Sequence, residues 1–332
     1  MLEAVLAAAD APARTAPNPC VGALVAAADG STHRGVTTPP GGPHAEIVAM
    51  TAAAASGTSM RDSTVFTTLE PCNHQGRTGP CTDALIAAGV RRVVVGMLDP
   101  DPLVSGSGVD SLRAAGISVE VGVCADEVAR QMRSYVHHRI HGRPFVTLKM
   151  AATMDGRTAA ADDSSQWITG DEARADVHAL RAASDGIIVG AGTVRSDDPS
   201  LTVRHVAGTD PARYVLGSAP ASAAVHPCTE LSGDLHDVLR SIGGDGVIDL
   251  LVEGGAQVAA DFHDGGFVDR YVIYLAPALM GSDRSRPLLA GRGSASMADV
   301  WRGQTVDVKL IGKDIRVTIE PGDDDPNAEI TL

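Results

Sequence analysis

Residues 44–46 read His-Ala-Glu, residues 68–72 read Thr-Leu-Glu-Pro-Cys, and the next cysteine in the chain is Cys81. One imidazole and two thiols, those of His44, Cys72 and Cys81, are the ligands of a zinc site with three protein donors, which leaves the fourth tetrahedral position to water. Such an open site is catalytic, because zinc lowers the pKa of its water ligand to roughly 7. We therefore predict a zinc site at these three residues, with Glu46 as the catalytic group that moves protons.

The order of the motifs narrows the chemistry further. His-x-Glu followed by Pro-Cys-x-x-Cys is the signature of zinc deaminases, in which the glutamate is the general acid and base and not a ligand. Here the Pro-Cys pair is present, but eight residues separate Cys72 from Cys81. A lone His or Cys is usually a packed or solvated residue, whereas this combination in this order is much rarer.

Helix and strand patterns surround these residues. The Ala-rich run 47–55 predicts a helix with the His-x-Glu segment in its first turn. The apolar run 65–69 predicts a buried strand that leads to the Pro-Cys pair, and residues 82–88 predict a helix that opens at Cys81. A thiolate at a helix N-terminus is stabilised by the helix dipole. We expect the metal where the end of one strand meets the beginnings of two helices.

Length and charge limit the kinds of protein this can be. The chain has 332 residues, 44% of them hydrophobic, with 36 glycines, which favours two domains of ordinary α/β packing over one core. It has 27 Lys and Arg against 41 Asp and Glu, for a net charge of −14. A protein this acidic lacks the basic surface that holds a phosphate polymer. We expect a small-molecule substrate and no nucleic-acid partner.

The cysteines and the N-terminus indicate the compartment. Cys20, Cys124 and Cys228, which the metal does not use, are too scattered in the sequence to form a disulfide framework. Residues 1–10 lack the basic leader of a signal peptide and contain two acidic residues, so they predict a short amphipathic helix. No apolar run approaches the ~20 residues that span a bilayer. We expect a cytoplasmic protein with no membrane contact.

Apolar and amphipathic runs alternate along the rest of the first half. They predict strands at 21–27, 91–97 and 117–121 and helices at 108–115 and 125–141. This alternation is typical of a largely parallel sheet covered on both sides, hence of an α/β fold. Residues 142–144, Gly-Arg-Pro, break the pattern. We therefore predict two domains, residues 1–142 and 143–332.

The second half has the same character. Strands are predicted at 144–151, 186–190, 213–217, 248–252, 268–276 and 308–320, and helices at 171–183 and from the paired glycines at 254–255 to about 263. A strand, paired glycines and a helix can bring backbone amides against a pyrophosphate. Residues 190–195 lack the third glycine of the dinucleotide fingerprint, so we do not expect a standard Rossmann fold.

Ten short motifs together carry a family resemblance. They are 18–22 (NPCVG), 43–46 (PHAE), 68–72 (TLEPC), 76–81 (GRTGPC), 99–100 (DP), 149–151 (KMA), 155–157 (DGR), 165–169 (SQWIT), 198–204 (DPSLTVR) and 252–255 (VEGG). In identity and order they resemble the bifunctional riboflavin-biosynthesis deaminase/reductase family over nearly the whole chain. The resemblance implies an N-terminal cytidine-deaminase-like three-layer domain and a C-terminal dihydrofolate-reductase-like domain.

The resemblance also implies two consecutive steps of riboflavin biosynthesis. In the first, 2,5-diamino-6-(5-phosphoribosylamino)pyrimidin-4-one loses a ring amino group by zinc-dependent hydrolysis, with Glu46 moving the proton. Asn18 and Arg77 match family positions that bind this substrate. In the second step, NADPH reduces the ribosyl group to a ribityl chain.

Family positions imply the contacts of the reductase half. Cofactor contacts are implied at Ala151, Trp167, Thr193, Asp197, Gly255, Ala256, Gln257, Val258, Ala259, Ala260 and Asp261. Substrate contacts are implied at Lys149, Ser165, Arg181, Leu201, Arg204 and Glu253. Two guanidiniums, those of Arg181 and Arg204, suit a ribose phosphate chemically.

The sequence departs from the family pattern at residues 36–40, Asp101 and Ser107, where details of phosphate binding are affected. We expect a homodimer, as is common among two-domain metabolic enzymes. Three alternatives stay open. One is a zinc deaminase of another nucleobase or of RNA with a binding-only second domain. Another is a protein with a structural zinc held by four protein ligands. The third has one active half and one degenerate half.

Overall fold

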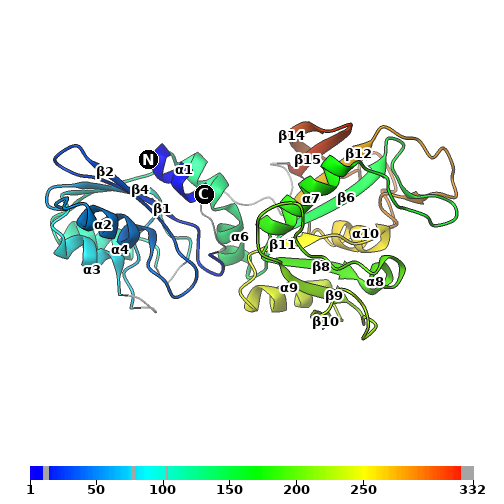
Figure 1. Ribbon diagram of the computed structural model, residues 1–332, viewed down its shortest axis with the longest axis horizontal. Helices are drawn as coiled ribbons and strands as arrows, with labels where there is room; N and C mark the ends of the chain where they lie inside the picture. Colours follow the sequence, from blue (N-terminus) through cyan, green and yellow to red (C-terminus); the bar gives the residue numbers. More distant parts are fainter. Residues whose placement is uncertain (10–14, 76–78, 102–103, 323–332) are drawn as a thin grey trace. The chain divides into compact units, whose positions relative to one another are not determined.

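The chain divides into two compact units, Met1–Gly142 and a second unit that begins at Arg143. The computed structural model describes residues 1–9, 15–75, 79–101 and 104–322, and each unit is described by itself (Figure 1). Within these ranges, none of the helices has the length and apolar character needed to cross a bilayer.

The first unit is built on a five-stranded sheet in the order β2-β1-β3-β4-β5. Its strands are β1 (Gly22–Ala26), β2 (Thr32–Val36), β3 (Thr64–Leu69), β4 (Arg92–Met97) and β5 (Ser118–Val121). β1 runs antiparallel to both β2 and β3, whereas β3, β4 and β5 are parallel. The sheet is therefore mixed, and the sequence patterns did not predict β2.

Helices cover both faces of this sheet. They are α1 (Leu2–Ala9), α2 (Ala45–Ala55), α3 (Cys81–Ala87), α4 (Ser107–Ala114), α5 (Ala125–Gln131) and α6 (Arg133–His141). Figure 1 shows α2, α3 and α4 along one side of the sheet and α1 on the other, where α1 contacts α5. The single helix predicted over 125–141 is wrong, because the chain breaks at Met132 into α5 and α6.

Two glycines bring helices unusually close to this sheet. A Cβ on Gly22 would lie 1.9 Å from the carbonyl oxygen of Ala4 in α1, and one on Gly35 would lie 2.2 Å from that of Ala45 in α2. Only glycine permits such an approach. The first turn of α2, which carries the His-x-Glu segment, is thereby held against β2.

The second unit is built on an eight-stranded sheet in the order β10-β9-β8-β11-β6-β12-β15-β14. Its strands are β6 (Phe145–Thr153), β8 (Gly186–Gly190), β9 (Ala212–Leu216), β10 (Thr229–Leu231), β11 (Asp249–Val252), β12 (Arg270–Ala276), β14 (Gly303–Ile311) and β15 (Asp314–Pro321). The six strands from β10 to β12 are parallel, and β15 and β14 are antiparallel additions. β7 (Arg157–Ala159) and β13 (Arg286–Pro287) pair separately.

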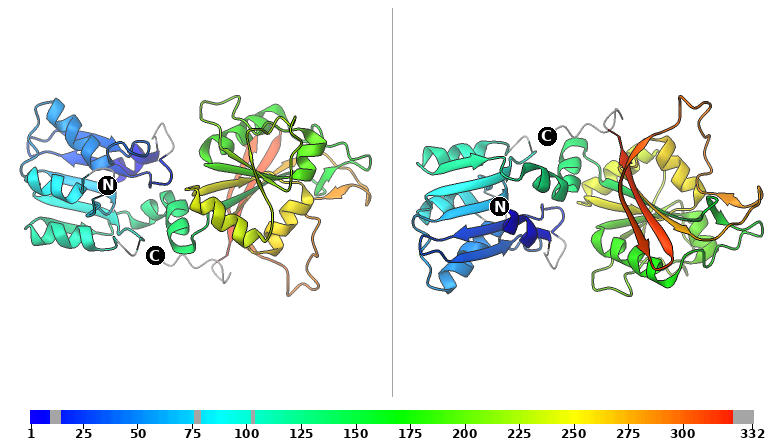
Figure 2. Two further views of the ribbon diagram at one scale, coloured as in Figure 1. Left: turned by 90° about the horizontal axis from the view of Figure 1, so that it is seen from below. Right: turned by 90° about the horizontal axis from the view of Figure 1, so that it is seen from above.

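The strand predicted over 308–320 is wrong. That segment is a hairpin of β14 and β15, with Gly312 in the turn at φ 60°. Figure 2 shows the hairpin at the end of the chain's colour range, in red, along one edge of the second unit. The alternation of apolar residues continues through the turn, so the sequence pattern alone did not separate the two strands.

Helices cover both faces of the second sheet as well. They are α7 (Asp171–Ala183), α8 (Ala191–Asp197), α9 (Leu235–Gly244) and α10 (Ala256–Asp264). Side chains alternate along β8, so that Ile188 packs in the core with α9 and α10, while Ile187 and Val189 pack with α8. This three-layer arrangement agrees with the predicted α/β class.

Candidate active sites

The first candidate site is where β3 ends and where α2 and α3 begin. His44 is the residue that precedes α2, Cys72 follows β3 by three positions, and Cys81 is the first residue of α3. Nδ1 of His44 lies 3.4 Å from Sγ of Cys72 and 3.4 Å from Sγ of Cys81. Three potential ligand atoms, drawn from distant positions in the sequence, thus converge within 4.8 Å of one another.

The geometry of this cluster fits zinc. Bonds of about 2.0–2.3 Å at tetrahedral angles place ligand atoms roughly 3.5–3.8 Å apart, close to the nitrogen–sulfur separations found here. One imidazole and two thiolates are a donor set that zinc prefers over magnesium or calcium. Across the described parts of the chain, no other three His, Cys, Asp or Glu side chains form such a cluster.

The surroundings of the thiols favour their ionisation. A hydrogen bond from the Cys81 thiol, followed by one from His44, lowers the pKa of Cys72 to about 4, and the backbone N–H of Cys81 donates to the same sulfur at 3.3 Å. The hydrogen bond to Cys72 raises the pKa of His44. The hydrogen bond to Cys72, together with burial, raises the pKa of Cys81. Without a cation, one thiolate therefore carries the charge, and metal binding releases the remaining protons.

Glu46 lies beside this cluster in the first turn of α2. Its carboxylate is buried, and burial raises its pKa to about 7. Oε2 of Glu46 is 3.6 Å from Sγ of Cys81. A carboxyl group with this pKa can both accept and release a proton near neutrality.

Glu70 organises the loop next to the metal ligands, a role that the sequence analysis missed. Its buried carboxylate accepts four backbone hydrogen bonds of 2.8–3.2 Å, from Asp99, Gly106, Gly108 and Val109. The loop after β4 is thereby fixed beside the residue pair Pro71-Cys72. The local sequence does not indicate this role, because the donors are backbone N–H groups that lie 29 to 39 positions from Glu70.

Two residues in this half, Asn18 and Arg77, were predicted to bind the substrate, and the structure describes the first of them. Asn18 lies half-buried in the loop before β1, where the backbone N–H of Gly22 donates to Oγ1 of Thr68 at 3.1 Å. Gly22 is the first residue of β1 and Thr68 is four residues before Cys72, so this hydrogen bond joins the beginning of β1 to the strand that leads to the metal cluster. Arg77 lies outside the described residues.

The second candidate site is a cavity of about 1560 Å³ in the second unit, at the carboxyl ends of β6, β8 and β11. Ligands bind at this edge in open parallel sheets. The predicted residues that line it are Lys149, Ala151, Ser165, Trp167, Arg181, Thr193, Asp197, Leu201, Arg204, Glu253, Gly255, Ala256, Gln257, Val258, Ala259 and Asp261. Ala260 does not line it, because it is buried on the inner face of α10.

Glycines open one wall of this cavity to a dinucleotide. A Cβ on Gly254 would lie 2.5 Å from the side chain of Val258, and one on Gly190 would lie 2.7 Å from it. The lack of a side chain at Gly190 lets the beginning of α8 approach α10, and the lack of one at Gly254 leaves room for Val258 where the chain enters α10. The N-terminus of α10 then offers backbone amides of the kind that bind a pyrophosphate.

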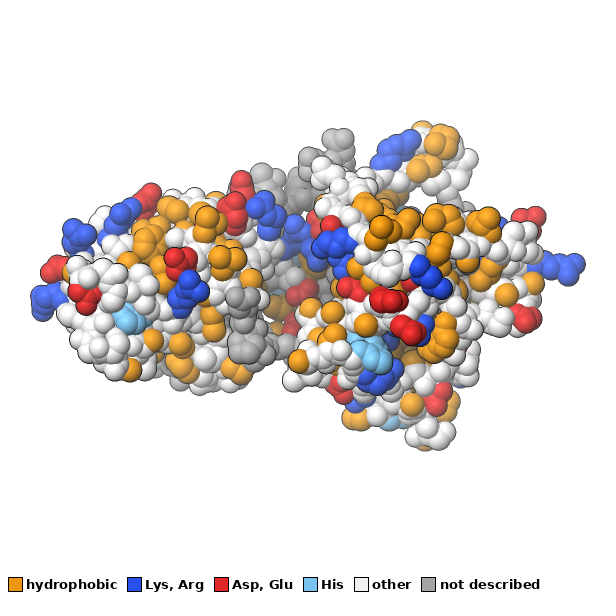
Figure 3. All heavy atoms as spheres, turned by 45° about the horizontal axis from the view of Figure 1, so that its top comes forward, with side chains coloured by type: hydrophobic (Ala, Val, Ile, Leu, Met, Phe, Trp, Pro, Cys, Tyr) orange, Lys and Arg blue, Asp and Glu red, His pale blue; other side chains and the backbone are white. Residues whose placement is uncertain are grey.

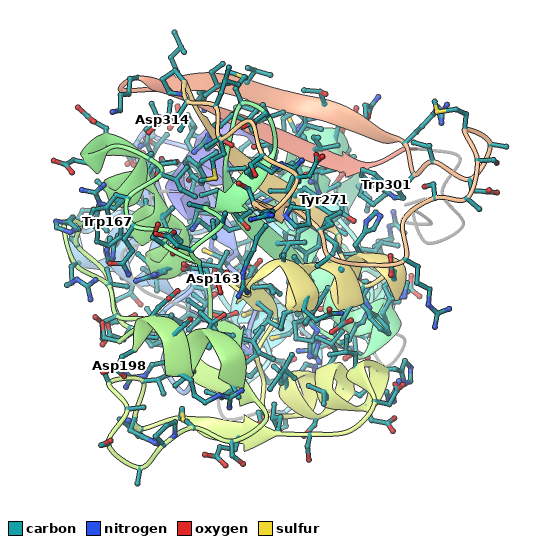
Figure 4. All side chains as sticks on the ribbon, turned by 90° about the vertical axis from the view of Figure 1, so that its right-hand side faces the viewer. Asp163, Trp167, Asp198, Tyr271, Trp301 and Asp314 are labelled. Atoms are coloured by element: carbon teal, nitrogen blue, oxygen red, sulfur yellow. The ribbon has the colours of Figure 1, made fainter. Side chains whose placement is uncertain are left out.

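Trp167 presents a large apolar surface to the same cavity. Its side chain is 70% exposed, and the guanidinium of Arg174 lies 4.5 Å from its ring centroid. Figure 4 shows Trp167 on the opposite side of this unit from Trp301, which packs against Tyr271. Of the two tryptophans in the chain, Trp167 is therefore the one placed to contact a ligand in the cavity.

Opposite charges meet at the floor of the cavity. Glu253 forms a bidentate pair with Arg181, and Nζ of Lys149 lies 3.9 Å from its Oε2. Burial acts to raise the pKa of Glu253, but the hydrogen bonds from Arg181 and the two neighbouring cations outweigh it, so that this pKa is lowered. Burial lowers the pKa of Lys149. The carboxylate is thus ionised at neutral pH.

Arg204 differs from these residues because its charge is available. Its side chain is exposed, and Nη1 donates to Oγ of Ser200 at 2.6 Å and to Oγ1 of Thr202 at 2.8 Å. In the described part of the chain it forms no ion pair with a carboxylate. An uncommitted guanidinium at a cavity wall can bind a phosphate.

Comparison with known proteins gives a consistent result for both units. Residues 144–317 match the family described as the RibD C-terminal domain, and residues 1–97 match the cytidine and deoxycytidylate deaminase zinc-binding region. The riboflavin biosynthesis protein RibD of Aquifex aeolicus is 37% identical, over 91% of this chain and 92% of that protein.

Two solved structures match nearly the whole chain as well. Acinetobacter baumannii RibD has a TM-score of 0.89 at 34% identity, covering 97% of both chains. A diaminohydroxyphosphoribosylaminopyrimidine deaminase/5-amino-6-(5-phosphoribosylamino)uracil reductase of Thermotoga maritima has a TM-score of 0.87 at 31% identity, again covering 97% of both chains. The predicted fold, a cytidine-deaminase-like first domain and a reductase domain after it, is confirmed.

Proposed function

This chain belongs to the RibD family of riboflavin biosynthesis proteins, and from that premise we propose which of its residues perform the two reactions of the family. The protein is a bifunctional enzyme, a zinc-dependent deaminase and an NADPH-dependent reductase. It catalyses the hydrolytic deamination of 2,5-diamino-6-(5-phosphoribosylamino)pyrimidin-4-one and then the reduction of the ribosyl group to a ribityl chain. We assign the deaminase to residues 1–142 and the reductase to residues 143–332.

In the deaminase, His44, Cys72 and Cys81 hold the zinc ion. Zinc, when bound there, acts as a Lewis acid that acidifies water. Glu46 takes a proton from the attacking water and delivers one to the departing ammonia, because its buried carboxylate has a pKa of about 7 and exchanges protons readily. Asn18 and Arg77 bind the substrate, and the loop fixed by Glu70 supports the metal ligands from the side of α4.

In the reductase, the beginning of α10 and its paired glycines hold the pyrophosphate of NADPH, and Trp167 provides an apolar surface for the cofactor. NADPH, when bound, supplies the hydride that reduces the sugar. The remaining cofactor contacts are at Ala151, Thr193, Asp197 and residues 255–261. The cavity of about 1560 Å³ has room for the cofactor and a second ligand.

The substrate of the reduction occupies the polar side of the same cavity. Arg204 binds its phosphate, because this guanidinium has no carboxylate partner among the described residues. Arg181, Lys149 and Glu253 form a fixed polar floor, and Ser165 and Leu201 contact the substrate from the loops on either side. These groups orient the substrate for the reduction. We assign no protein side chain as a general acid in this step.

The observation that carries this assignment is the convergence of His44, Cys72 and Cys81 beside a buried glutamate. The test is a pair of separate assays on the phosphoribosylated pyrimidine, ammonia release and NADPH oxidation. Both activities are expected from the full chain. Ammonia release without NADPH oxidation, even on the deaminated substrate, would instead support a deaminase with a binding-only second domain.

We also propose that the protein is a homodimer that forms through β14. This strand is the edge of the eight-stranded sheet, and Val306, Val308 and Leu310 are 47%, 59% and 76% exposed. Val308 and Leu310 are two positions apart, beyond the register shift between Thr305 and Asp307, and they form an apolar stripe on one face of the strand. A second copy of the same strand, related by a two-fold axis, would cover the stripe and the unpaired edge together.

Hydrophobic side chains also reach the surface of the second unit between charged ones (Figure 3).

For the cellular location of the protein, we propose the cytoplasm. All five cysteines are unpaired, and two of them are needed as thiolates for the metal.

A further inference from the structure

Arg204 receives its position from the segment that precedes it. Its guanidinium donates to the hydroxyls of Ser200 and Thr202, which lie four and two positions earlier in the chain. Ser200 lines the cavity, and both hydroxyls keep these places only while the backbone from 200 to 204 keeps its present path. The direction of the guanidinium therefore depends on backbone conformation more than on any contact of its own with a rigid element.

That backbone path is unusual and needs anchors. Leu201 is buried in the core, although its φ of 53° lies in the left-handed region that non-glycine residues disfavour. The backbone N–H of Val203 donates to Oδ1 of Asp210 at 2.8 Å. His205, directly after Arg204, again has a positive φ, of 58°. Such a conformation persists only where surrounding contacts over-determine it.

His178 provides the anchor at Arg204 itself. It lies on α7, lines the same cavity and is only 5% exposed. Its Nδ1 accepts a hydrogen bond from the backbone N–H of Arg204 at 3.0 Å. The ring also packs edge-on against that of His205, with centroids 4.8 Å apart. The 13-residue helix α7 thus holds the end of the segment 200–205 through this hydrogen bond and this ring contact.

The ring is suited to remain an acceptor. Burial lowers the pKa of His178 to about 4, and the nearby charges of Arg181, Arg204 and His205 act in the same direction. The imidazole is therefore neutral at physiological pH, with Nδ1 free of a proton and able to accept. A protonated imidazole would carry two N–H donors and could not make this bond.

We propose that His178 is a positioning residue for substrate binding in the reductase, which fixes the phosphate-binding guanidinium of Arg204 through the hydrogen bond to its backbone. The proposal rests on the proposed function, in which Arg204 contacts the phosphate monoester of the substrate. His178 touches neither the reacting carbon nor the cofactor in this account. Its loss should weaken substrate binding and leave the other steps of the reduction intact.

A matched pair of variants tests this. In His178→Asn the amide oxygen stands close to the place of Nδ1 and keeps an acceptor, whereas in His178→Gln the amide reaches toward the place of Nε2 and Nδ1 has no replacement. His178→Leu is a second variant without an acceptor, in case His178→Gln does not fold. The assay is NADPH oxidation by the full-length enzyme on the deaminated substrate.

The account predicts a selective effect. His178→Gln should raise the KM for the substrate about tenfold, while kcat and the KM for NADPH stay within about twofold. His178→Asn should stay within about threefold of the parent in every parameter. A merely structural role would lower the thermal transition and kcat in both variants alike. An equal KM for the substrate in the Asn and Gln variants, raised or unchanged, would overturn the proposal.

Arg204→Ala separates this proposal from the one on which it rests. If Arg204→Ala leaves the KM for the substrate unchanged, the assignment of Arg204 to the phosphate is wrong. If Arg204→Ala raises the KM and His178→Gln does not, the assignment of Arg204 stands and the role of His178 is wrong. A raised KM in both, with recovery in His178→Asn, supports both.

Discussion

The guanidinium of Arg181 binds both carboxylate oxygens of Glu253, with Nε 2.6 Å from Oε1 and Nη2 2.9 Å from Oε2. The two side chains are only 12% and 9% exposed, so the pair is desolvated. Both residues match substrate positions of the family, yet each already satisfies the other. Arg181 and Glu253 are therefore a fixed element of the cavity, whereas Arg204 pairs with no carboxylate among the described residues and is available to a ligand.

Breaking this pair should destabilise the reductase unit. Arg181→Ala leaves a buried carboxylate without its bidentate partner, and we expect a loss of about 3–5 kcal/mol in the free energy of unfolding. The measurement is urea unfolding of the full chain. The transition of the reductase unit is identified as the one that NADPH stabilises. Arg286→Ala is the control, because its pair with Asp163 is largely exposed and should contribute less than about 1 kcal/mol. Equal losses in the two variants would contradict the account.

Glu46→Gln should separate metal binding from proton transfer. The amide keeps the size of the side chain but cannot carry protons, so ammonia release should fall roughly 10²–10⁴-fold. Zinc content should not change, because Glu46 is not one of the three ligands. NADPH oxidation on the deaminated substrate serves as the control and should also be unchanged. Ammonia release within a few-fold of the parent would show that another group moves the proton.

Trp167 should report on NADPH binding. Replacement of the indole by the smaller phenyl ring in Trp167→Phe is expected to cost about 0.5–1.5 kcal/mol, which corresponds to a rise in the KM for NADPH of about two- to tenfold. Addition of NADPH should change the tryptophan fluorescence of the parent and of Trp301→Phe, but not that of Trp167→Phe. Trp301 is the matched control, because it packs against Tyr271 and His263. A signal that follows Trp301 instead would place the cofactor elsewhere.

A charge on the exposed stripe of β14 should prevent dimerisation. Leu310→Glu puts a carboxylate at the most exposed apolar position of that strand, where a second copy would bury it. Light scattering after gel filtration should give a dimer for the parent and a monomer for this variant. Leu6→Glu, at an exposed leucine of α1, is the control and should remain dimeric. A dimeric Leu310→Glu would exclude this interface.

The metal cluster and most elements could be predicted from the sequence because their signals are short and local. His44, Cys72 and Cys81 each mark the end of a strand or the beginning of a helix, and strand pairing then determines where they meet. β2 was missed because residues 32–36 read Thr-His-Arg-Gly-Val and have no continuous apolar run. Its identity as an edge strand depends on pairing with β1, which a local pattern does not encode.

Other elements were missed although a signal existed. Asp234 caps α9 by accepting from the backbone N–H of His236, and Leu235, Val238 and Ile242 recur at helical spacing behind it. The loop role of Glu70 and the anchoring of Arg204 by His178 were beyond sequence reasoning. Both depend on backbone N–H groups more than 25 positions away, and a backbone donor has no sequence signature.

The zinc content of purified protein under reducing conditions tests directly whether His44, Cys72 and Cys81 hold one zinc ion. The account predicts about one zinc per chain in the parent and in Cys20→Ser, and less than roughly a tenth of that in the double variant Cys72→Ser/Cys81→Ser. The double variant should release no ammonia and still oxidise NADPH on the deaminated substrate. Stoichiometric zinc in the double variant, or none in the parent, would contradict the account.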